Sequence, residues 1–201
     1  MADPTAPLPL FLREFLRAPT WTGAVTPSSA ALARQMVLPI PEQGDPVVVE
    51  VGPGTGAFSA EIERRLAGRG RHVAVEINPV LVRHLTARFP GMEVAEGDAT
   101  RLPEILTGYG IERADVIVSG LPWFAYQAPA AQPLVCTMAE TLADHGVLTQ
   151  FAYSWSRWVP PARRLLRSLH VGFEEVVISR TVWPNLPPAT VYFARRPRRT
   201  G

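Results

Sequence analysis

The run Val-Val-Val-Glu-Val-Gly-Pro-Gly-Thr-Gly at residues 47–56 constrains the fold of this chain more than any other stretch. Valines on both sides of Glu50 predict a buried parallel strand, and glycines at alternate positions predict a tight turn directly after it. Residues 57–66 then place apolar side chains at helical spacing among charged ones, which predicts a helix. Because glycines have no Cβ, a ligand can lie against the backbone and the amides of the helix start. We therefore predict a cofactor pocket at Gly52, Gly54 and Gly56.

The composition limits the kind of protein and the kind of partner. With 201 residues, 47% of them hydrophobic, the chain is long enough for one globular domain with its own core. Its formal net charge of +2 provides no strong field for nucleic acid. Cys136 is the single cysteine, so a disulfide framework and a cysteine-rich metal site are excluded, and we expect a reducing cytoplasm. Prolines interrupt the uncharged stretch 116–139, which favours a soluble fold over a membrane span.

Two segments near the ends of the chain suggest a membrane contact. Residues 8–16 predict a helix with an apolar face, which either packs across the domain as a lid or lies in a lipid interface. The arginine pairs 195–196 and 198–199 predict either a solvated tail or a contact for anionic lipid or RNA. We expect a helical cap or lid at 1–45 and a main domain at 46–201, together one compact unit.

Predicted strands and helices alternate along the rest of the chain. This alternation predicts a doubly wound α/β sheet that ends in a hairpin, with a proline-rich loop at 183–189 between its last two strands. Besides the first strand, the predicted strands are residues 72–77, 92–95, 114–119, 146–153, 173–182 and 190–194. The predicted helices are residues 30–38, 57–66, one that starts at Asn78-Pro79, 133–142 and 163–169.

Acidic side chains end two of these strands next to the glycine-rich turn. Glu76 follows that turn by about twenty residues, where it can accept hydrogen bonds from a ribose diol. Asp98 can accept a hydrogen bond from the exocyclic amine of adenine. The loop that starts at Gly120 follows the predicted strand 114–119 and lies beside the first strand, where open parallel sheets bind ligands. The glycines fall as Gly-x-Gly-x-Gly, whereas a nicotinamide fingerprint has Gly-x-Gly-x-x-Gly. A cap at a strand end is the alternative role for both acids.

These motifs resemble those of the class I S-adenosylmethionine-dependent methyltransferases, from residue 47 to residue 194. The resemblance implies a seven-stranded Rossmann-like sheet of order 3-2-1-4-5-7-6 with the last strand antiparallel. It implies S-adenosyl-L-methionine as cofactor and S-adenosyl-L-homocysteine as product. The three glycines would surround the methionine part, Glu76 would bind the ribose, and Asp98 with Ala99 the adenine. Glu50 would orient the methionine ammonium; its alternative role is that of a structural carboxylate. Ile77 and Ser119 are the remaining residues expected to bind the cofactor.

Within that class the chain resembles the bacterial phospholipid N-methyltransferases, which are similar to the rRNA adenine dimethyltransferases. The matching segments are the predicted N-terminal helix with its apolar face and residues 23–29, 119–122, 150–153 and 180–189. This implies N-methylation of a phosphatidylethanolamine-type lipid by a cytoplasmic protein peripheral to the inner face of the membrane. The rRNA enzymes carry Asn or Asp before Leu-Pro-aromatic where this chain has Ser119-Gly120, so a nucleic acid partner is not expected. A small-molecule methyltransferase of secondary metabolism, an rRNA adenine methyltransferase and an inactive cofactor-binding scaffold remain as alternatives.

The expected chemistry is an in-line displacement that needs no metal, because the methyl group of a sulfonium is already activated. We expect Tyr153 to accept a hydrogen bond from the acceptor amine, with Trp123 and Tyr126 shaping the pocket. An aromatic pocket suits an amine that becomes cationic on methylation. The four histidines are interpreted as surface residues: His72, His84, His145 and His170.

Overall fold

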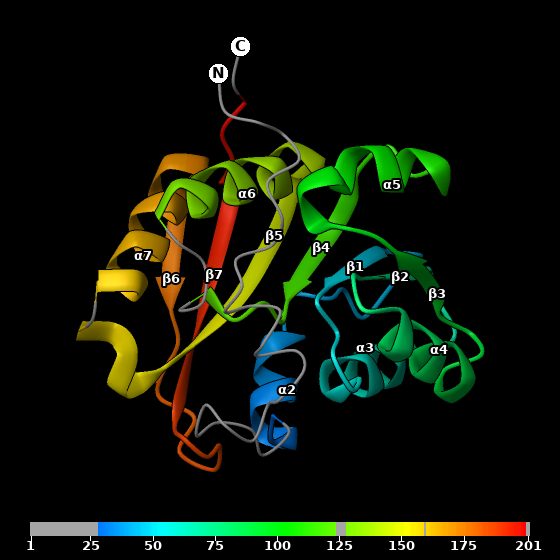
Figure 1. Ribbon diagram of the computed structural model, residues 1–201, viewed down its shortest axis with the longest axis horizontal. Helices are drawn as coiled ribbons and strands as arrows, with labels where there is room; N and C mark the ends of the chain where they lie inside the picture. Colours follow the sequence, from blue (N-terminus) through cyan, green and yellow to red (C-terminus); the bar gives the residue numbers. More distant parts are fainter. Residues whose placement is uncertain (1–27, 124–127, 159, 200–201) are drawn as a thin grey trace.

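The molecule is built on one seven-stranded sheet of order β3-β2-β1-β4-β5-β7-β6 (Figure 1). The structure is a computed structural model that describes residues 28–123, 128–158 and 160–199. β1 to β5 pair in parallel, whereas β7 is antiparallel to both β5 and β6. The strands are β1 (Val47–Val51), β2 (Arg71–Glu76), β3 (Glu93–Glu96), β4 (Ala114–Ser119), β5 (Leu142–Tyr153), β6 (Phe173–Ile178) and β7 (Ala189–Pro197). The predicted sheet, its strand order and its antiparallel last strand are confirmed.

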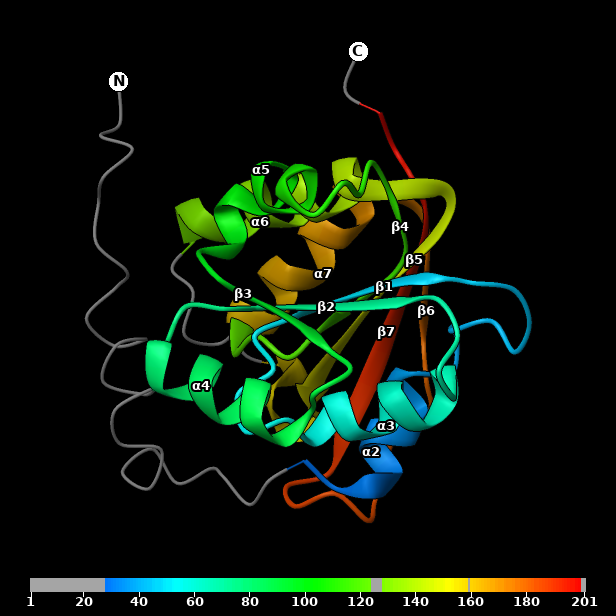
Figure 2. The same cartoon turned by 90° about the vertical axis from the view of Figure 1, so that its right-hand side faces the viewer.

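Helices cover both faces of this sheet. α2, α3 and α4 lie against one face, and α5, α6 and α7 lie against the other (Figure 2). Their bounds are α2 (Ala30–Met36), α3 (Ala57–Leu66), α4 (Pro79–Arg88), α5 (Leu102–Gly108), α6 (Ala128–Thr141) and α7 (Pro160–Gly172). Two short 3₁₀ segments are η1 (Ala99–Arg101) and η3 (Ser154–Trp158). In the described ranges, no helix is both long and apolar enough to cross a membrane.

The valines of β1 explain why the sheet is buried on both sides. Side chains alternate between the faces of a strand, so Val49 and Val51 join the core under α5, α6 and α7. Val48 joins the core on the opposite face, together with Phe58 and Ile62 of α3. Glu50 has the same parity as Val48, so its carboxylate lies on the side of the sheet that α3 covers.

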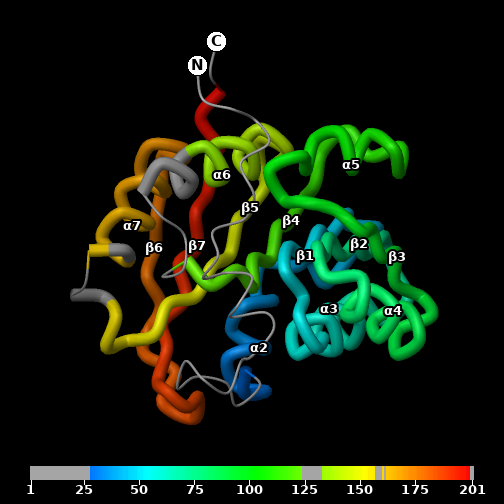
Figure 3. Tube along the Cα trace, viewed as in Figure 1, coloured from blue at the N-terminus to red at the C-terminus, as the bar shows by residue number. Residues whose placement is uncertain are grey.

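α2 belongs to the main core. Its start is capped by Ser29, whose hydroxyl accepts a hydrogen bond from Leu32 N at 3.1 Å. Leu32 and Met36 are buried with Val116 and Val191 of β4 and β7. Figure 3 shows α2 beside the loop that joins β6 to β7. The predicted cap at 1–45 stays a prediction, because residues 1–27, with the predicted helix at 8–16, lie outside the described residues.

Several element boundaries differ from the predictions. α5 and the two 3₁₀ segments were not predicted; α5 has only seven residues, too few for a clear helical period, although Leu102 and Leu106 are buried at helical spacing. α6 starts at Ala128, and Pro133 lies inside the helix rather than at its first turn. β5 begins at Leu142 instead of residue 146, and β6 ends at Ile178 instead of residue 182.

Candidate active site

The glycine-rich loop joins β1 to α3 with three residues in left-handed backbone conformations. Gly52, Gly54 and Gly56 have φ of +69°, +59° and +85°. A Cβ on Gly52 would lie 2.8 Å from Leu121 Cδ2, and one on Gly56 would lie 2.6 Å from Phe89 Cε2. A Cβ on Gly54 would meet no atom within 4 Å. The left-handed backbone favours glycine at all three positions, and the close contacts with Leu121 and Phe89 add to this at positions 52 and 56. Gly54 instead borders open space where a ligand can approach.

The acidic residues predicted to hold the adenosyl part lie on neighbouring strand ends. The Glu76 carboxylate accepts hydrogen bonds from Gly54 N at 3.2 Å and Asn78 N at 2.9 Å, so it ties β2 to the glycine-rich loop. Burial raises the pKa of Glu76, although these backbone amides oppose the shift. Asp98 Oδ1 accepts from Thr100 N and Oγ1, both at 2.9 Å, and so caps η1. Gly97 N donates to Glu76 O at 3.0 Å, which holds the two strand ends together.

Glu50 lies in a buried polar network under α3. Its Oε2 accepts a hydrogen bond from Ser59 Oγ at 2.6 Å and lies 3.2 Å from His72 Nε2. His72 Nδ1 in turn lies 2.7 Å from Glu63 Oε1 on α3. Glu50 Oε1 is buried and has no hydrogen-bond partner among the described residues. The network satisfies one carboxylate oxygen and leaves the other for a donor from outside it.

His72 corrects one of the predictions. We expected a surface histidine because the residue stands near the start of a strand, but its side chain is buried beneath α3. Burial acts to lower the pKa of His72, but the carboxylates of Glu50 and Glu63 outweigh burial and raise it above its usual value. The other three histidines are exposed, as predicted: His84, His145 and His170.

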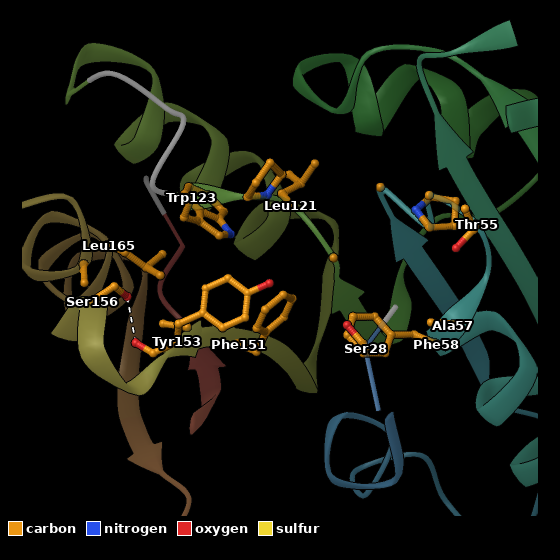
Figure 4. Close-up of a pocket in the computed structure, with 17 residues that line it drawn as sticks. Ser28, Thr55, Ala57, Phe58, Leu121, Trp123, Phe151, Tyr153, Ser156 and Leu165 are labelled. Atoms are coloured by element: carbon orange, nitrogen blue, oxygen red, sulfur yellow. Dashed lines mark hydrogen bonds between the residues drawn. The ribbon is translucent and has the colours of Figure 1, made fainter. Parts of the chain in front are cut away.

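A cavity of about 170 Å³ opens at the carboxyl ends of β1, β4 and β5 (Figure 4). Its floor includes Gly52 and Gly54 of the glycine-rich loop and Gly120 after β4. The rings of Trp123, Phe151 and Tyr153 lie close together on one side of the cavity, and Thr55 lies on the other (Figure 4). None of the described residues that line it is charged. The cavity therefore offers an apolar, aromatic environment beside a polar backbone loop.

Tyr153 provides a polar group in this aromatic wall. Its hydroxyl points toward the middle of the cavity (Figure 4). Its ring meets Phe151 edge to face at 5.6 Å and stacks on Trp155 at 6.4 Å between ring centroids. Burial raises the pKa of Tyr153, so the phenol stays neutral at physiological pH. A neutral hydroxyl can position an amine by accepting one of its hydrogens.

The structure separates the predicted site residues into two groups. Gly52, Gly54, Trp123 and Tyr153 line the cavity. The others do not: Glu50, Gly56, Glu76, Ile77, Asp98, Ala99 and Ser119. Ser119 is fully buried at the end of β4, with no hydrogen-bond partner for its hydroxyl in the described part of the chain. Tyr126 lies outside the described residues.

Some cavity residues were not predicted. Phe58 and Phe151 pack edge to face at 5.7 Å between ring centroids, although one lies in the first turn of α3 and the other near the end of β5. Phe151 stands two residues before Tyr153, in the segment 150–153 that resembles the phospholipid N-methyltransferases. That resemblance could have indicated Phe151 as a cavity residue. Leu165 comes from α7, and nothing in its own sequence context indicated the cavity.

Gly120 fits closely against the glycine-rich loop. Its N–H donates to Val51 O at 2.8 Å, and a Cβ at this position would lie 2.5 Å from Gly52 O. A larger residue here, such as the Asn or Asp of the rRNA enzymes, would need the two loops to move apart. Within the described ranges, no group of three or more His, Cys, Asp or Glu side chains is arranged to hold a metal ion.

The sequence of this chain is similar to a protein family and to individual methyltransferases. A family model described as a methyltransferase domain matches residues 48–146. An ornithine lipid N-methyltransferase of Singulisphaera acidiphila is 34% identical over 192 residues, which cover 92% of this chain and 94% of that protein. A ribosomal RNA small subunit methyltransferase A of Synechococcus is 43% identical over 77 residues, 36% of this chain and 26% of the relative.

Solved structures share the fold at low sequence identity. A SAM-dependent O-methyltransferase from Thermotoga maritima aligns with a TM-score of 0.66 at 10% identity, over 93% of this chain and 73% of that one. At this identity the similarity describes the sheet and its helices, and it carries no information on the acceptor.

Proposed function

Since this chain belongs to the S-adenosylmethionine-dependent methyltransferases, we propose that it methylates the amine of a lipid headgroup at a membrane surface. The observation that carries the proposal is the similarity, over nearly the whole chain, to an ornithine lipid N-methyltransferase. An ornithine lipid and a phosphatidylethanolamine-type lipid both present a primary amine, and these are the acceptors that we propose. The protein would act in the cytoplasm, peripheral to the inner face of the membrane.

The residues present fit S-adenosylmethionine. The buried Oε1 of Glu50 has no partner among the described residues and suits a cationic donor such as the methionine ammonium. Open space at Gly54 suits the methionine chain. We propose that Glu76 binds the ribose and that Asp98, with Ala99, binds the adenine; Ile77, Ser119, Gly52 and Gly56 shape the surrounding backbone. When bound, this cofactor supplies a methyl group on a sulfonium that needs no further activation.

The cavity can prepare the acceptor amine for attack. An amine that leaves water for an uncharged, apolar site loses basicity, which favours the neutral form with a free lone pair. The Tyr153 hydroxyl would accept one N–H and so fix the direction of that lone pair. Rings of Trp123 and Phe151 would stabilise the positive charge that develops on nitrogen. No charged side chain lines the described wall, so the released proton would pass to water.

A methyl-transfer assay with radiolabelled cofactor tests the proposed function. We expect label in phosphatidylethanolamine or an ornithine lipid, presented in vesicles or detergent micelles. Phosphatidylcholine and phosphatidylglycerol are matched controls, because neither headgroup has an amine N–H to replace. Label in soluble amines or in RNA, with none in lipid, would contradict the proposal. Tight cofactor binding without any labelled acceptor would favour a scaffold.

A further inference from the structure

Three large apolar side chains stand exposed at one end of the molecule. Trp183 and Leu186, in the loop that joins β6 to β7, are 74% and 73% exposed, and Trp155 of η3 is 59% exposed. We call these three residues the apolar rim. Their exposure contributes nothing to the core. The segments that carry them are neighbours, because Ser154 N donates to Pro188 O. Exposed large apolar groups on neighbouring segments mark a surface that contacts another phase or molecule.

The loop that carries Trp183 and Leu186 is held by buried hydrogen bonds. Asn185 is buried between them, and its Oδ1 accepts from Ser29 N at 2.9 Å while its Nδ2 donates to Pro187 O at 2.7 Å. The backbone N–H of Asn185 also donates to Val182 O at 3.3 Å. With the polar residue turned inward, the two apolar residues on either side of it are turned outward.

The apolar rim borders the cavity. Trp155 stacks on the ring of Tyr153, which lines the cavity, with an angle of 7° between the ring planes. Ser154 N donates to Pro188 O at 2.8 Å, so η3 and the β6–β7 loop are joined. Ser28, next to the Ser29 that holds Asn185, also lines the cavity. The segments that carry the rim are therefore neighbours of residues that line the cavity.

The segments that carry the rim have one sign of charge. Residues 154–192 contain five arginines and two acids, Glu174 and Glu175. Both acids lie at the start of β6, which pairs with the C-terminal end of β7 and so lies away from the rim. On α7, Arg163 and Arg167 are exposed while Leu165 and Leu169 are buried, so this helix turns cations outward. Tryptophan favours the boundary between headgroups and acyl chains, and arginine is attracted to anionic headgroups.

The C-terminal arginines do not share this arrangement. Arg199 donates to Leu142 O at 2.9 Å and to Asp144 Oδ1 at 2.5 Å, and Arg198 Nε donates to Phe173 O at 3.3 Å. β7 runs antiparallel to β5, so its C-terminal end lies beside the amino-terminal part of β5, at the end of the strands opposite to the cavity. These arginines have partners within the chain and face away from the site.

We infer that the apolar rim docks this protein on an anionic lipid bilayer, with Trp155, Trp183 and Leu186 in the interface and the arginines of α7 and Arg180 toward the lipid phosphates. This inference rests on the proposed lipid acceptor, and it assigns the surface that delivers the acceptor to the cavity. A lipid headgroup would then reach Tyr153 without leaving the interface.

Vesicle co-sedimentation without cofactor tests the docking surface independently of methyl transfer. The probes are vesicles of equal parts phosphatidylglycerol and phosphatidylcholine, and vesicles of phosphatidylcholine alone. The full chain should bind the anionic vesicles, and W183S/L186S should bind them about tenfold more weakly. Both positions are about three-quarters exposed, so the fold should be kept, which circular dichroism checks. The matched control is Val171→Ser, an exposed apolar residue near the end of α7, which should bind like the unmodified chain.

The outcomes separate docking from the proposed function. Equal vesicle binding by W183S/L186S and the unmodified chain would overturn the inference. A dimer of the unmodified chain that W183S/L186S converts to monomer would assign the rim to a second copy, and would also overturn it. If W183S/L186S loses vesicle binding and Val171→Ser keeps it, the docking surface is supported, whether or not a lipid is methylated. A failure to methylate any lipid would contradict only the proposed acceptor.

Discussion

At the scale of single residues, Tyr153 is the polar side chain that faces the cavity from its aromatic wall. Tyr153→Phe keeps the ring, its edge-to-face contact with Phe151 and its stack on Trp155, and removes only the hydroxyl. We expect the methyl-transfer rate to fall about tenfold or more, because the amine loses the group that orients it, while cofactor affinity is kept. Single-turnover kinetics and calorimetry measure the two quantities.

Tyr109→Phe is the matched control for this substitution. Tyr109 lies outside the cavity, and its hydroxyl donates to Val94 O at 3.3 Å. The control should lose little activity. A Tyr153→Phe protein as fast as the unmodified chain would remove Tyr153 from the mechanism.

At the scale of elements, the contact of β2 with α3 depends on a buried charge network. The folded pKa of His72 is raised, so its stabilising contribution is complete below the ordinary histidine pKa of about 6.5 and is lost as pH rises through the higher folded value. We expect His72→Gln to cost about 1–3 kcal/mol of unfolding free energy at low pH and to flatten this pH dependence. Urea unfolding on both sides of neutral pH measures it.

His84→Gln controls for the loss of a histidine as such. His84 is exposed on α4, so its replacement should leave both the stability and its pH profile nearly unchanged. A His72→Gln protein with the pH profile of the unmodified chain would show that the network carries no charge on His72.

At the scale of the whole molecule, cofactor binding should stabilise the fold. A ligand of the folded state at a hundred times its Kd adds about 2.7 kcal/mol, which corresponds to a rise in Tm of roughly 5–10 °C for a chain of this size. S-adenosylhomocysteine should produce this rise, and Glu76→Ala should abolish it through loss of the ribose contact. Calorimetry with and without the ligand measures the shift.

Glu96→Ala provides the matched control for the cofactor. Glu96 pairs in register with Glu76 at the end of the neighbouring strand, but its side chain is exposed. Its replacement should keep the full rise in Tm. An undiminished rise with Glu76→Ala would show that the ribose is held elsewhere.

Local patterns predicted those parts of the fold that local chemistry determines. A few residues were enough to predict each of three features: the strand β1 from its valines, the turn from its alternate glycines, and the helix α3 from its apolar stripe. α5 escaped prediction because a seven-residue helix hardly differs from a turn by its period, and its stability comes from the core that Leu102 and Leu106 enter. Strand order followed from the family resemblance, since no single segment specifies its neighbour in a sheet.

The sequence alone determined a βα unit with a glycine turn, two acids at strand ends and an aromatic segment around Tyr153. Tertiary structure decided which of these groups meet. It buried His72 against Glu50, brought Phe58 to Phe151, and left Trp183 exposed on the loop that joins β6 to β7. The physical reason is that burial and contact depend on how strands from distant parts of the chain are ordered in the sheet, and that order exists only when the whole core is packed.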